Sequence, residues 1–192
     1  MEAFLLAWMI SASPGREALR FEAVHEQGGD LSCGLAAVAS LADLYWGLPC
    51  READLREALA PPEGAEEKAA DLAELSRLLA ARGFAVRALR LDPVSASAVL
   101  DRGFAPLLVH LRDDGGHFAL LLALDRGTAV TADPARGLGT FGAEEFRESF
   151  SGGALAAVLP GARVDREELA ARVGRALASR RLLETLAEES LP

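Results

Sequence analysis

Apolar residues recur at helical spacing through the first half of this chain. Over Leu35–Trp46 they fall every three to four positions, which predicts a helix that begins near Cys33. The same spacing predicts a short helix over Arg51–Ala60, ended by a pair of prolines, and a stronger one over Glu66–Arg82, ended by a glycine. We therefore expect several helices before the main sheet begins.

Extended patterns dominate from there on. Phe84–Ala88 alternates in the manner of a strand, and Pro93–Arg102 predicts one more short helix. Three short apolar runs follow, separated by turns rich in aspartate and glycine: Leu107–Leu111, His117–Leu122 and Thr128–Thr131. Such turns join consecutive antiparallel strands. The order of elements predicts an α+β fold in which the helix beginning at Cys33 packs on an antiparallel β-sheet.

Each end of the chain allows two interpretations. Phe4–Ile10 is an apolar run followed by small residues, as in a secretory signal peptide, but Glu2 stands where basic residues are usual, so a segment that packs on the domain is the alternative. Asp165–Ala187 predicts an amphipathic helix that either packs back on the domain or docks a partner. The expected organisation has three parts: a signal peptide or N-terminal extension (1–20), one main domain (21–160) and a helical tail (161–192).

Composition narrows the classes of partner. The 192 residues are 51% hydrophobic, which is enough for one domain with its own core. The formal net charge of -9, without a basic cluster, argues against nucleic acid and anionic membranes as partners. No apolar run is long enough for a transmembrane span. A peptide or protein partner remains compatible with this composition.

Cys33 is the strongest candidate for chemistry. At the N-terminus of a helix, exposed N–H groups and the helix dipole stabilise a thiolate, which is the reactive form of cysteine. Gly34, having no side chain, would let a substrate carbonyl approach the backbone. Cys50 lies beyond the other end of the same predicted helix, too far from Cys33 for a disulfide, and is interpreted as a small packing residue.

Two further residues have the chemistry to serve a cysteine nucleophile. His117 opens one predicted strand and Asp133 closes the next, so the two side chains would meet at one rim if these strands are antiparallel neighbours. Imidazole can act as base and then acid, while a carboxylate fixes its orientation. Gln27, six residues before Cys33, could donate to an oxyanion beside the Cys33 backbone N–H.

The remaining histidines are weaker candidates. His25 lies in a polar stretch, and His110 sits on an apolar strand, where a core or sheet-face residue is the expected interpretation. Neither has the close paired spacing of zinc ligands with Cys33, and no phosphate-binding loop is present. We expect no metal and no cofactor.

These motifs resemble peptidase family C39, the bacteriocin-processing or double-glycine leader peptidases, over residues 21–160. The shared segments are Gln27, Cys33–Ala37, Tyr45–Gly47, His117–Phe118, Asp133–Gly137, Glu145–Phe146 and Phe150–Gly152. The resemblance implies a papain-like fold with Cys33 as nucleophile, His117 as general base and acid, Asp133 as the orienting residue and Gln27 as oxyanion donor.

One departure refines the resemblance. Exporter-fused members commonly have aspartate directly before the cysteine, whereas this chain has Ser32. It is more similar to stand-alone members, some of which are encoded with functional-amyloid or pilus secretion systems and often carry signal peptides. That similarity favours a periplasmic or exported protein, with a cytoplasmic one as the alternative.

Three classes of function follow. The first is a cysteine endopeptidase that cleaves a peptide or leader segment linked to bacterial secretion, bacteriocin or fibre export. The second is a peptidase-like module that binds such a segment without cleaving it. The third is an acyl-transferring enzyme with the same triad, for which the spacing from Gln27 to Cys33 is less natural.

Overall fold

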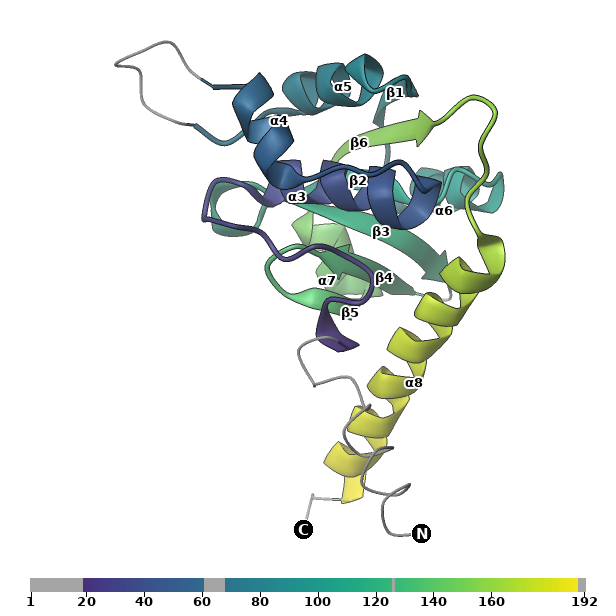
Figure 1. The fold of residues 1–192 in the computed structure, drawn as a ribbon. Coiled ribbons are helices and arrows are strands. Elements are labelled where there is room, and N and C mark those ends of the chain that lie inside the picture. The colour runs from purple at the N-terminus through teal and green to yellow at the C-terminus, as the bar shows by residue number, and fades with distance from the viewer. Residues whose placement is uncertain (1–18, 61–67, 126, 190–192) are drawn as a thin grey trace, which may run out of the picture.

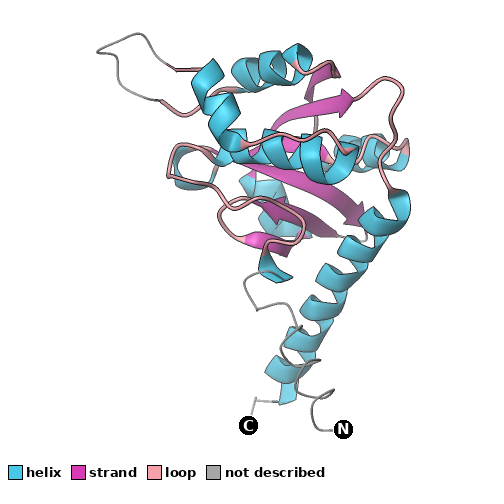
Figure 2. Cartoon of the chain, viewed as in Figure 1, coloured by secondary structure: helices cyan, strands magenta, loops and turns pink. Residues whose placement is uncertain are grey.

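The structure, a computed structural model, describes residues 19–60, 68–125 and 127–189, and an antiparallel sheet with helices on both faces lies at its centre (Figures 1 and 2). The predicted nucleophile helix forms as α3 (Cys33–Ser40) and continues as a π-helical segment, η1 (Leu41–Tyr45). Every residue of α3 is buried, which explains why the segment contains no charged side chain.

The other predicted helices form with shifted ends, as α4 (Glu52–Ala58), α5 (Leu72–Ala81), α6 (Pro93–Asp101) and α8 (Arg166–Glu189). The described residues also form a helix α7 (Ala143–Ser149) and a 3-10 turn, η2 (Asp113–Gly115), between two strands. The prediction that α5 starts at Glu66 was wrong. Asp71 and Glu74 form a capping box, in which Asp71 Oδ1 accepts from the Glu74 N–H at 2.8 Å, so the helix begins only at Leu72.

Six antiparallel strands make up the sheet. They are β1 (Ala85–Arg90), β2 (Leu107–Leu111), β3 (His117–Asp125), β4 (Thr128–Asp133), β5 (Gly137–Gly142) and β6 (Phe150–Val158), in the order β1-β6-β2-β3-β4-β5. The predicted meander of β2, β3 and β4 is therefore confirmed. In contrast, β5, β6 and α7 were not predicted, and β6 lies between β1 and β2 rather than at an edge.

Alternation along the strands divides the core into two layers. Phe118, Leu120 and Leu122 of β3 face α3 and α5, whereas Ala119 and Leu121 face α6 and α7. The sheet thus has a helical layer on each face, and α3 lies directly over β3 (Figure 1). This arrangement places the N-terminus of α3 at the end of the sheet where β3 begins.

The two halves of α8 differ in environment. In the first half, Ala176 is buried in the core and the Arg172 guanidinium stacks on the Tyr45 ring, 4.8 Å from its centroid. In the second half, Leu182 and Leu183 are 61% and 67% exposed. The expectation that this helix packs back on the domain is therefore confirmed for its first half, while the second half extends away from the sheet (Figure 1).

The start of the described chain is held against the turn that follows β4. Arg20 donates from Nε to the Arg136 carbonyl at 2.8 Å and from Nη2 to the Ala135 carbonyl at 3.2 Å. Gly137, in the left-handed region with φ of +84°, allows this approach. The apolar run at 4–10 lies outside the described residues. Within the described part of the chain, no helix is both long and apolar enough to cross a membrane.

We expect Gly137→Ala to destabilise the fold more than Gly161→Ala. Both glycines have φ near +84°, a conformation that costs other residues about 1–2 kcal/mol. A Cβ on Gly137 would lie 2.4 Å from the Arg20 carbonyl oxygen, whereas Gly161 has nothing within 4 Å. Urea unfolding should give a loss of about 1 kcal/mol for Gly161→Ala and about 3 kcal/mol for Gly137→Ala. Equal losses would show that Arg20 is not held there in solution.

Candidate active site

Cys33 is the first residue of α3, and its thiol is buried with 5% of the residue exposed. Burial alone would raise the pKa of this thiol. The hydrogen bond to the His117 side chain and hydrogen bonds to the backbone of Phe118 and Gly34 outweigh burial, so the pKa of Cys33 lies below its ordinary value. The helix N-terminus adds the favourable end of the helix dipole. This position therefore favours a thiolate.

His117 and Asp133 meet as the strand pattern predicted. β3 and β4 are antiparallel neighbours, so the start of one lies beside the end of the other. His117 Nε2 and Asp133 Oδ1 are 2.8 Å apart, and only 2% of the Asp133 side chain is exposed. Because Nε2 is taken by the carboxylate, Nδ1 is the ring nitrogen left for Cys33.

The turn that follows β4 donates further hydrogen bonds to the Asp133 carboxylate. Its Oδ1 also accepts from the backbone N–H groups of Ala135, at 2.8 Å, and Arg136, at 3.1 Å. Burial would raise the pKa of this carboxyl, but the bonds from His117 and from the turn hold the pKa below its usual range. Asp133 is thus ionised where it contacts the imidazole.

The pKa of His117 responds to both of its partners. Burial would lower it, but the carboxylate of Asp133 and the sulfur of Cys33 raise it to about 9. The lowered pKa of Cys33 and the raised pKa of His117 both favour a thiolate paired with an imidazolium over a neutral thiol and imidazole. Such a pair combines a nucleophile with a proton donor, the two groups that acyl transfer requires.

Gln27 lies in the turn that leads into α3. Its backbone N–H donates to the Pro134 carbonyl at 3.0 Å, which ties this turn to the residue after Asp133. Its side-chain Nε2 donates to the Gly29 carbonyl at 3.0 Å. An amide nitrogen carries two hydrogens, so one N–H of Gln27 remains for another acceptor. These two bonds tie Gln27 to the turn after Asp133 and to the loop before Cys33, and neither of them contacts Cys33 itself.

Gly34 has a different explanation from the one that the sequence suggested. A Cβ at this position would lie 3.0 Å from Cδ1 of Leu75 and 3.2 Å from the Phe118 ring. The missing side chain thus allows α3 to pack closely between α5 and β3, rather than making room for a substrate. Close packing here fixes the height of Cys33 above the sheet.

The remaining candidates lie away from this cluster. Cys50 is buried in the core, and burial raises the pKa of its thiol, which confirms it as a packing residue. His25 pairs with Asp43 through Nε2 and Oδ2, 2.9 Å apart, and is partly exposed. Among the described residues, no group of three or more histidine, cysteine or acidic side chains has the arrangement of a metal site.

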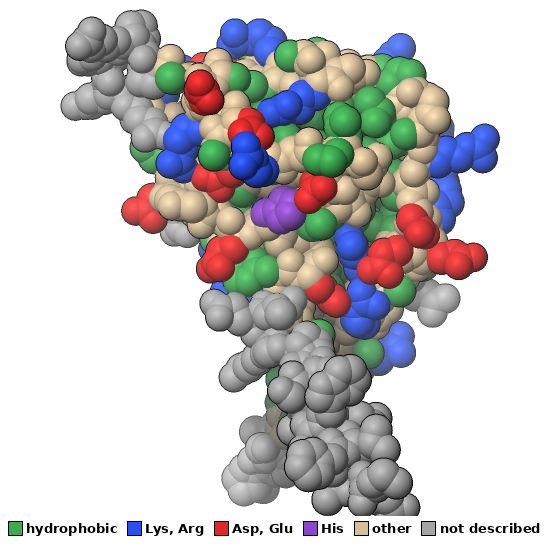
Figure 3. Space-filling model, viewed as in Figure 1, with side chains coloured by type: hydrophobic (Ala, Val, Ile, Leu, Met, Phe, Trp, Pro, Cys, Tyr) green, Lys and Arg blue, Asp and Glu red, His purple; other side chains and the backbone are tan. Residues whose placement is uncertain are grey.

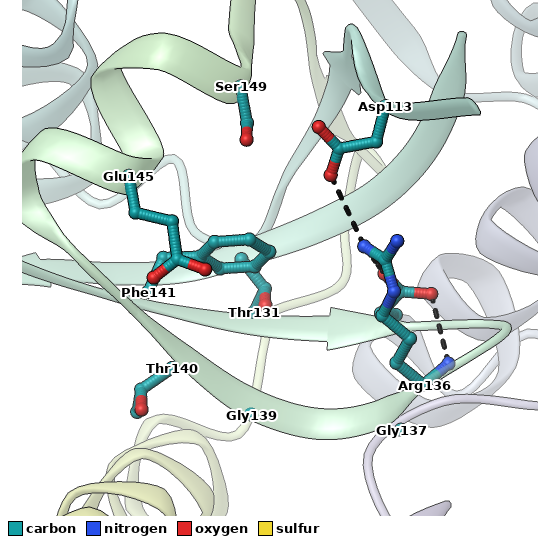
Figure 4. A pocket seen from close by; sticks show the side chains of 10 residues that line it. Asp113, Thr131, Arg136, Gly137, Gly139, Thr140, Phe141, Glu145 and Ser149 are labelled. Atoms are coloured by element: carbon teal, nitrogen blue, oxygen red, sulfur yellow. Dashed lines mark hydrogen bonds and ion pairs between the residues drawn. The ribbon is translucent and has the colours of Figure 1, made fainter. Parts of the chain in front are cut away.

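Two contacts of the site were not anticipated from the sequence. The Arg136 guanidinium lies 3.3 Å from Asp113 Oδ2 and 3.7 Å from Asp133 Oδ2, so it joins η2 to the end of β4. Figure 4 shows Arg136 reaching Asp113 across the rim of a cavity of about 440 Å³, which Glu145 and Phe141 border on the opposite side. Asp133 lines this cavity from the sheet, whereas Cys33 does not.

The second contact concerns His110. Strand pairing sets it opposite Phe118, and its ring meets the Phe118 ring edge-on with centroids 4.9 Å apart. Its Nδ1 is 2.9 Å from the Ser151 hydroxyl. Burial and the neighbouring Arg112 lower the pKa of His110. The expected position of His110 on a sheet face is confirmed. The register between β2 and β3 also places His110 beside the start of β3, and no local sequence signal predicts that neighbourhood.

Comparisons by sequence and by structure find relatives that are described as proteases or peptidase domains. A functional amyloid protease FapD, described as probable, from Pseudomonas aeruginosa is 26% identical over 137 residues, which is 69% of this chain and 59% of that protein. The match therefore spans less than two thirds of the relative's length. The peptidase domain of Streptococcus ComA, a bifunctional ABC transporter of a quorum-sensing pathway, is 20% identical with a TM-score of 0.60, covering 70% of this chain and 96% of that domain.

A second solved structure is a double glycine motif protease from an AMS/PCAT transporter, in complex with the leader peptide. It is 22% identical, with a TM-score of 0.54, over 70% of this chain and 89% of that one. These likenesses show the fold, which is papain-like, as expected. The model of the peptidase C39 family matches residues 22–159, well over half of the chain. This chain therefore belongs to the peptidase C39 family.

Proposed function

We propose that the chain is a cysteine endopeptidase with Cys33 as nucleophile, His117 as general base and acid, and Asp133 as the residue that orients the imidazole. The observation that carries the proposal is the hydrogen-bonded chain from Cys33 through His117 to the buried Asp133. Membership of a peptidase family supports the same reaction class. A non-cleaving binding module would have no need for this charge arrangement.

In the proposed reaction, the Cys33 thiolate attacks the scissile carbonyl. The resulting oxyanion would accept from the backbone N–H of Cys33 and from the free N–H of Gln27, and each such donor contributes about 3 kcal/mol in related sites. The imidazolium of His117 gives its proton to the leaving amine, leaving an acyl-enzyme. The neutral imidazole then activates water, which releases Cys33 as thiolate and restores the imidazolium.

The proposed substrate is a peptide or leader segment of an exported polypeptide, with a link to secretion or functional-amyloid fibres. The support comes from the relatives, one described as a probable functional amyloid protease and one solved with its leader peptide. The face shown in Figure 3 mixes acidic, basic and apolar side chains, as expected of a surface that contacts polypeptides rather than one charged polymer. A periplasmic or exported location is part of the proposal.

Cleavage of a peptide library is the direct test. We expect the purified chain to cut peptides from a digested bacterial proteome at a recurring sequence, identified by mass spectrometry of the new N-termini. Cys33→Ala should abolish these cuts, while Cys50→Ala, which removes the buried packing thiol, should leave the recurring sequence unchanged. Peptides that are retained by the wild type but never cut would instead indicate a binding module.

A further inference from the structure

The segment that leads to Gln27 is fixed at its start by Tyr45. The Tyr45 hydroxyl donates to the Ala23 carbonyl at 2.8 Å, and both residues are buried. Burial raises the pKa of Tyr45 to about 12, so the hydroxyl keeps its proton and remains a donor at neutral pH. Ala23 precedes Gln27 by only four residues. This bond therefore sets where the chain enters the turn that carries Gln27.

Two further hydrogen bonds hold the same segment to the active site. The His25 N–H donates at 2.8 Å to the hydroxyl of Ser40, the last residue of α3. The Gln27 N–H donates to the Pro134 carbonyl, as described above. The segment is thus attached at every second residue, at 23, 25 and 27. Because the Gln27 side chain is carried by this backbone, the place of its free N–H depends on all three bonds.

Helix α8 contacts the segment and the residue that holds it. The Arg172 guanidinium stacks on the Tyr45 ring, 4.8 Å from its centroid, and only 10% of the Arg172 side chain is exposed. One helical turn further on, Arg175 Nε lies 2.7 Å from Oε1 of Glu22, the residue before Ala23. Two arginines of α8 thus support the donor of the hydrogen bond and the neighbour of its acceptor.

We propose that Tyr45 and Arg172 are positioning residues for Gln27. Helix α8 would then support catalysis, although it lies outside residues 22–159, the region that the family model matches. The inference rests on the proposed peptidase function and on the oxyanion role of Gln27 within it. A misplacement of about 1 Å in such a site costs about 10²-fold in rate, and complete loss of an oxyanion donor costs about 10²- to 10³-fold.

Tyr45→Phe removes only the hydroxyl and leaves a ring for Arg172. We expect kcat for peptide cleavage to fall by about tenfold or more with little change in KM, because the oxyanion forms only after the substrate has bound. Alkylation of Cys33 by iodoacetamide should keep its rate, since that displacement forms no oxyanion. In a Gln27→Ala background, Tyr45→Phe should change kcat by less than about twofold, because the residue through which it acts is absent.

Arg172→Met tests the part of α8, with Arg180→Met as its matched control. Arg180 also lies on α8, but its partner, Glu184, is on the same helix at 2.7 Å. We expect Arg172→Met to lower kcat severalfold and Arg180→Met to leave it unchanged. Hydrogen exchange of the Gln27 N–H should quicken severalfold in Arg172→Met and Tyr45→Phe, while exchange in the sheet stays as in the wild type.

Several outcomes overturn the inference while leaving the proposed function intact. One is an unchanged kcat in Tyr45→Phe when Gln27→Ala alone lowers kcat. Others are an equal fall of kcat in the Gln27→Ala background, and exchange that quickens throughout the sheet, which would show a general loss of stability. A wild type that cuts no peptide overturns the proposed function and the catalytic part of this inference, and exchange of the Gln27 N–H then still shows whether Tyr45 holds the turn.

Discussion

Iodoacetamide should alkylate Cys33 more than tenfold faster than Cys50 at pH 7. An ordinary thiol with a pKa of 9.0 is only about 1% thiolate at that pH, which limits its rate. The hydrogen bond to His117 lowers the pKa of Cys33, whereas burial raises the pKa of Cys50. Both residues are equally buried at 5% exposure, so the difference in rate reports thiolate content rather than access. Intact-mass spectrometry over time measures it.

Three variants separate the causes of this reactivity. Cys33→Ala should remove the fast label completely, and Cys50→Ala should leave its rate unchanged. His117→Ala removes the hydrogen bond that lowers the pKa of Cys33, so the fast phase should slow toward the rate of an ordinary thiol. If both cysteines react slowly and equally in the wild type, the ion pair does not exist in solution and the proposed mechanism loses its nucleophile.

The second large effect is expected from Asp133→Asn. This change keeps the shape of the side chain but removes the charge that raises the pKa of His117 to about 9. Loss of the orienting carboxylate in comparable sites costs about 10⁴ in turnover, so we expect peptide cleavage to fall by about a thousandfold or more. The pKa of His117 should return toward its ordinary value of 6.5.

The sign of the pH dependence follows from that shift. Because the folded pKa of His117 is raised, the imidazolium and the stability that it contributes are fully present below pH 6.5 and are lost as the pH rises through about 9. In Asp133→Asn the loss should be complete well below pH 9. The thiolate persists when the imidazolium loses its proton, so the rate of Cys33 alkylation between pH 5 and pH 10 should show a second inflection there, whose position reports the pKa of His117 in each protein.

Asp113→Asn is the matched control for this experiment. The Arg136 guanidinium lies 3.3 Å from Asp113 and also pairs with Asp133. The carboxylate bonded to His117 is that of Asp133, not that of Asp113. Removing the Asp113 charge should leave the upper inflection of the alkylation profile near that of the wild type. A profile that moves equally in both variants would mean that overall negative charge, rather than the direct bond to Asp133, sets the pKa of His117.

Local signals predicted the parts of the site that depend on neighbouring residues in the chain. The helix at Cys33 was predictable because its apolar positions recur over three turns. The meeting of His117 and Asp133 was predictable because short turns force consecutive strands into antiparallel pairs. The catalytic roles proposed for these residues come from the family motifs.

Long-range pairing explains what the sequence did not reveal. β5 and β6 are rich in glycine and alanine, so they lack the alternation of large apolar and polar residues that marks a strand. Their strand form depends on neighbours distant in sequence, β1 and β2 in the case of β6. The contacts of Arg136 with Asp113 and of His110 with Phe118 likewise depend on strand register.

The position of β6 also sets the point during synthesis at which the sheet can be completed. A growing polypeptide that has passed Asp133 already contains every residue proposed for chemistry, but β1 still has no neighbour in the sheet. Only when Phe150–Val158 has left the ribosome can the gap between β1 and β2 be filled. The sheet of a nascent chain therefore stays incomplete until almost the whole of the region matched by the family has been translated.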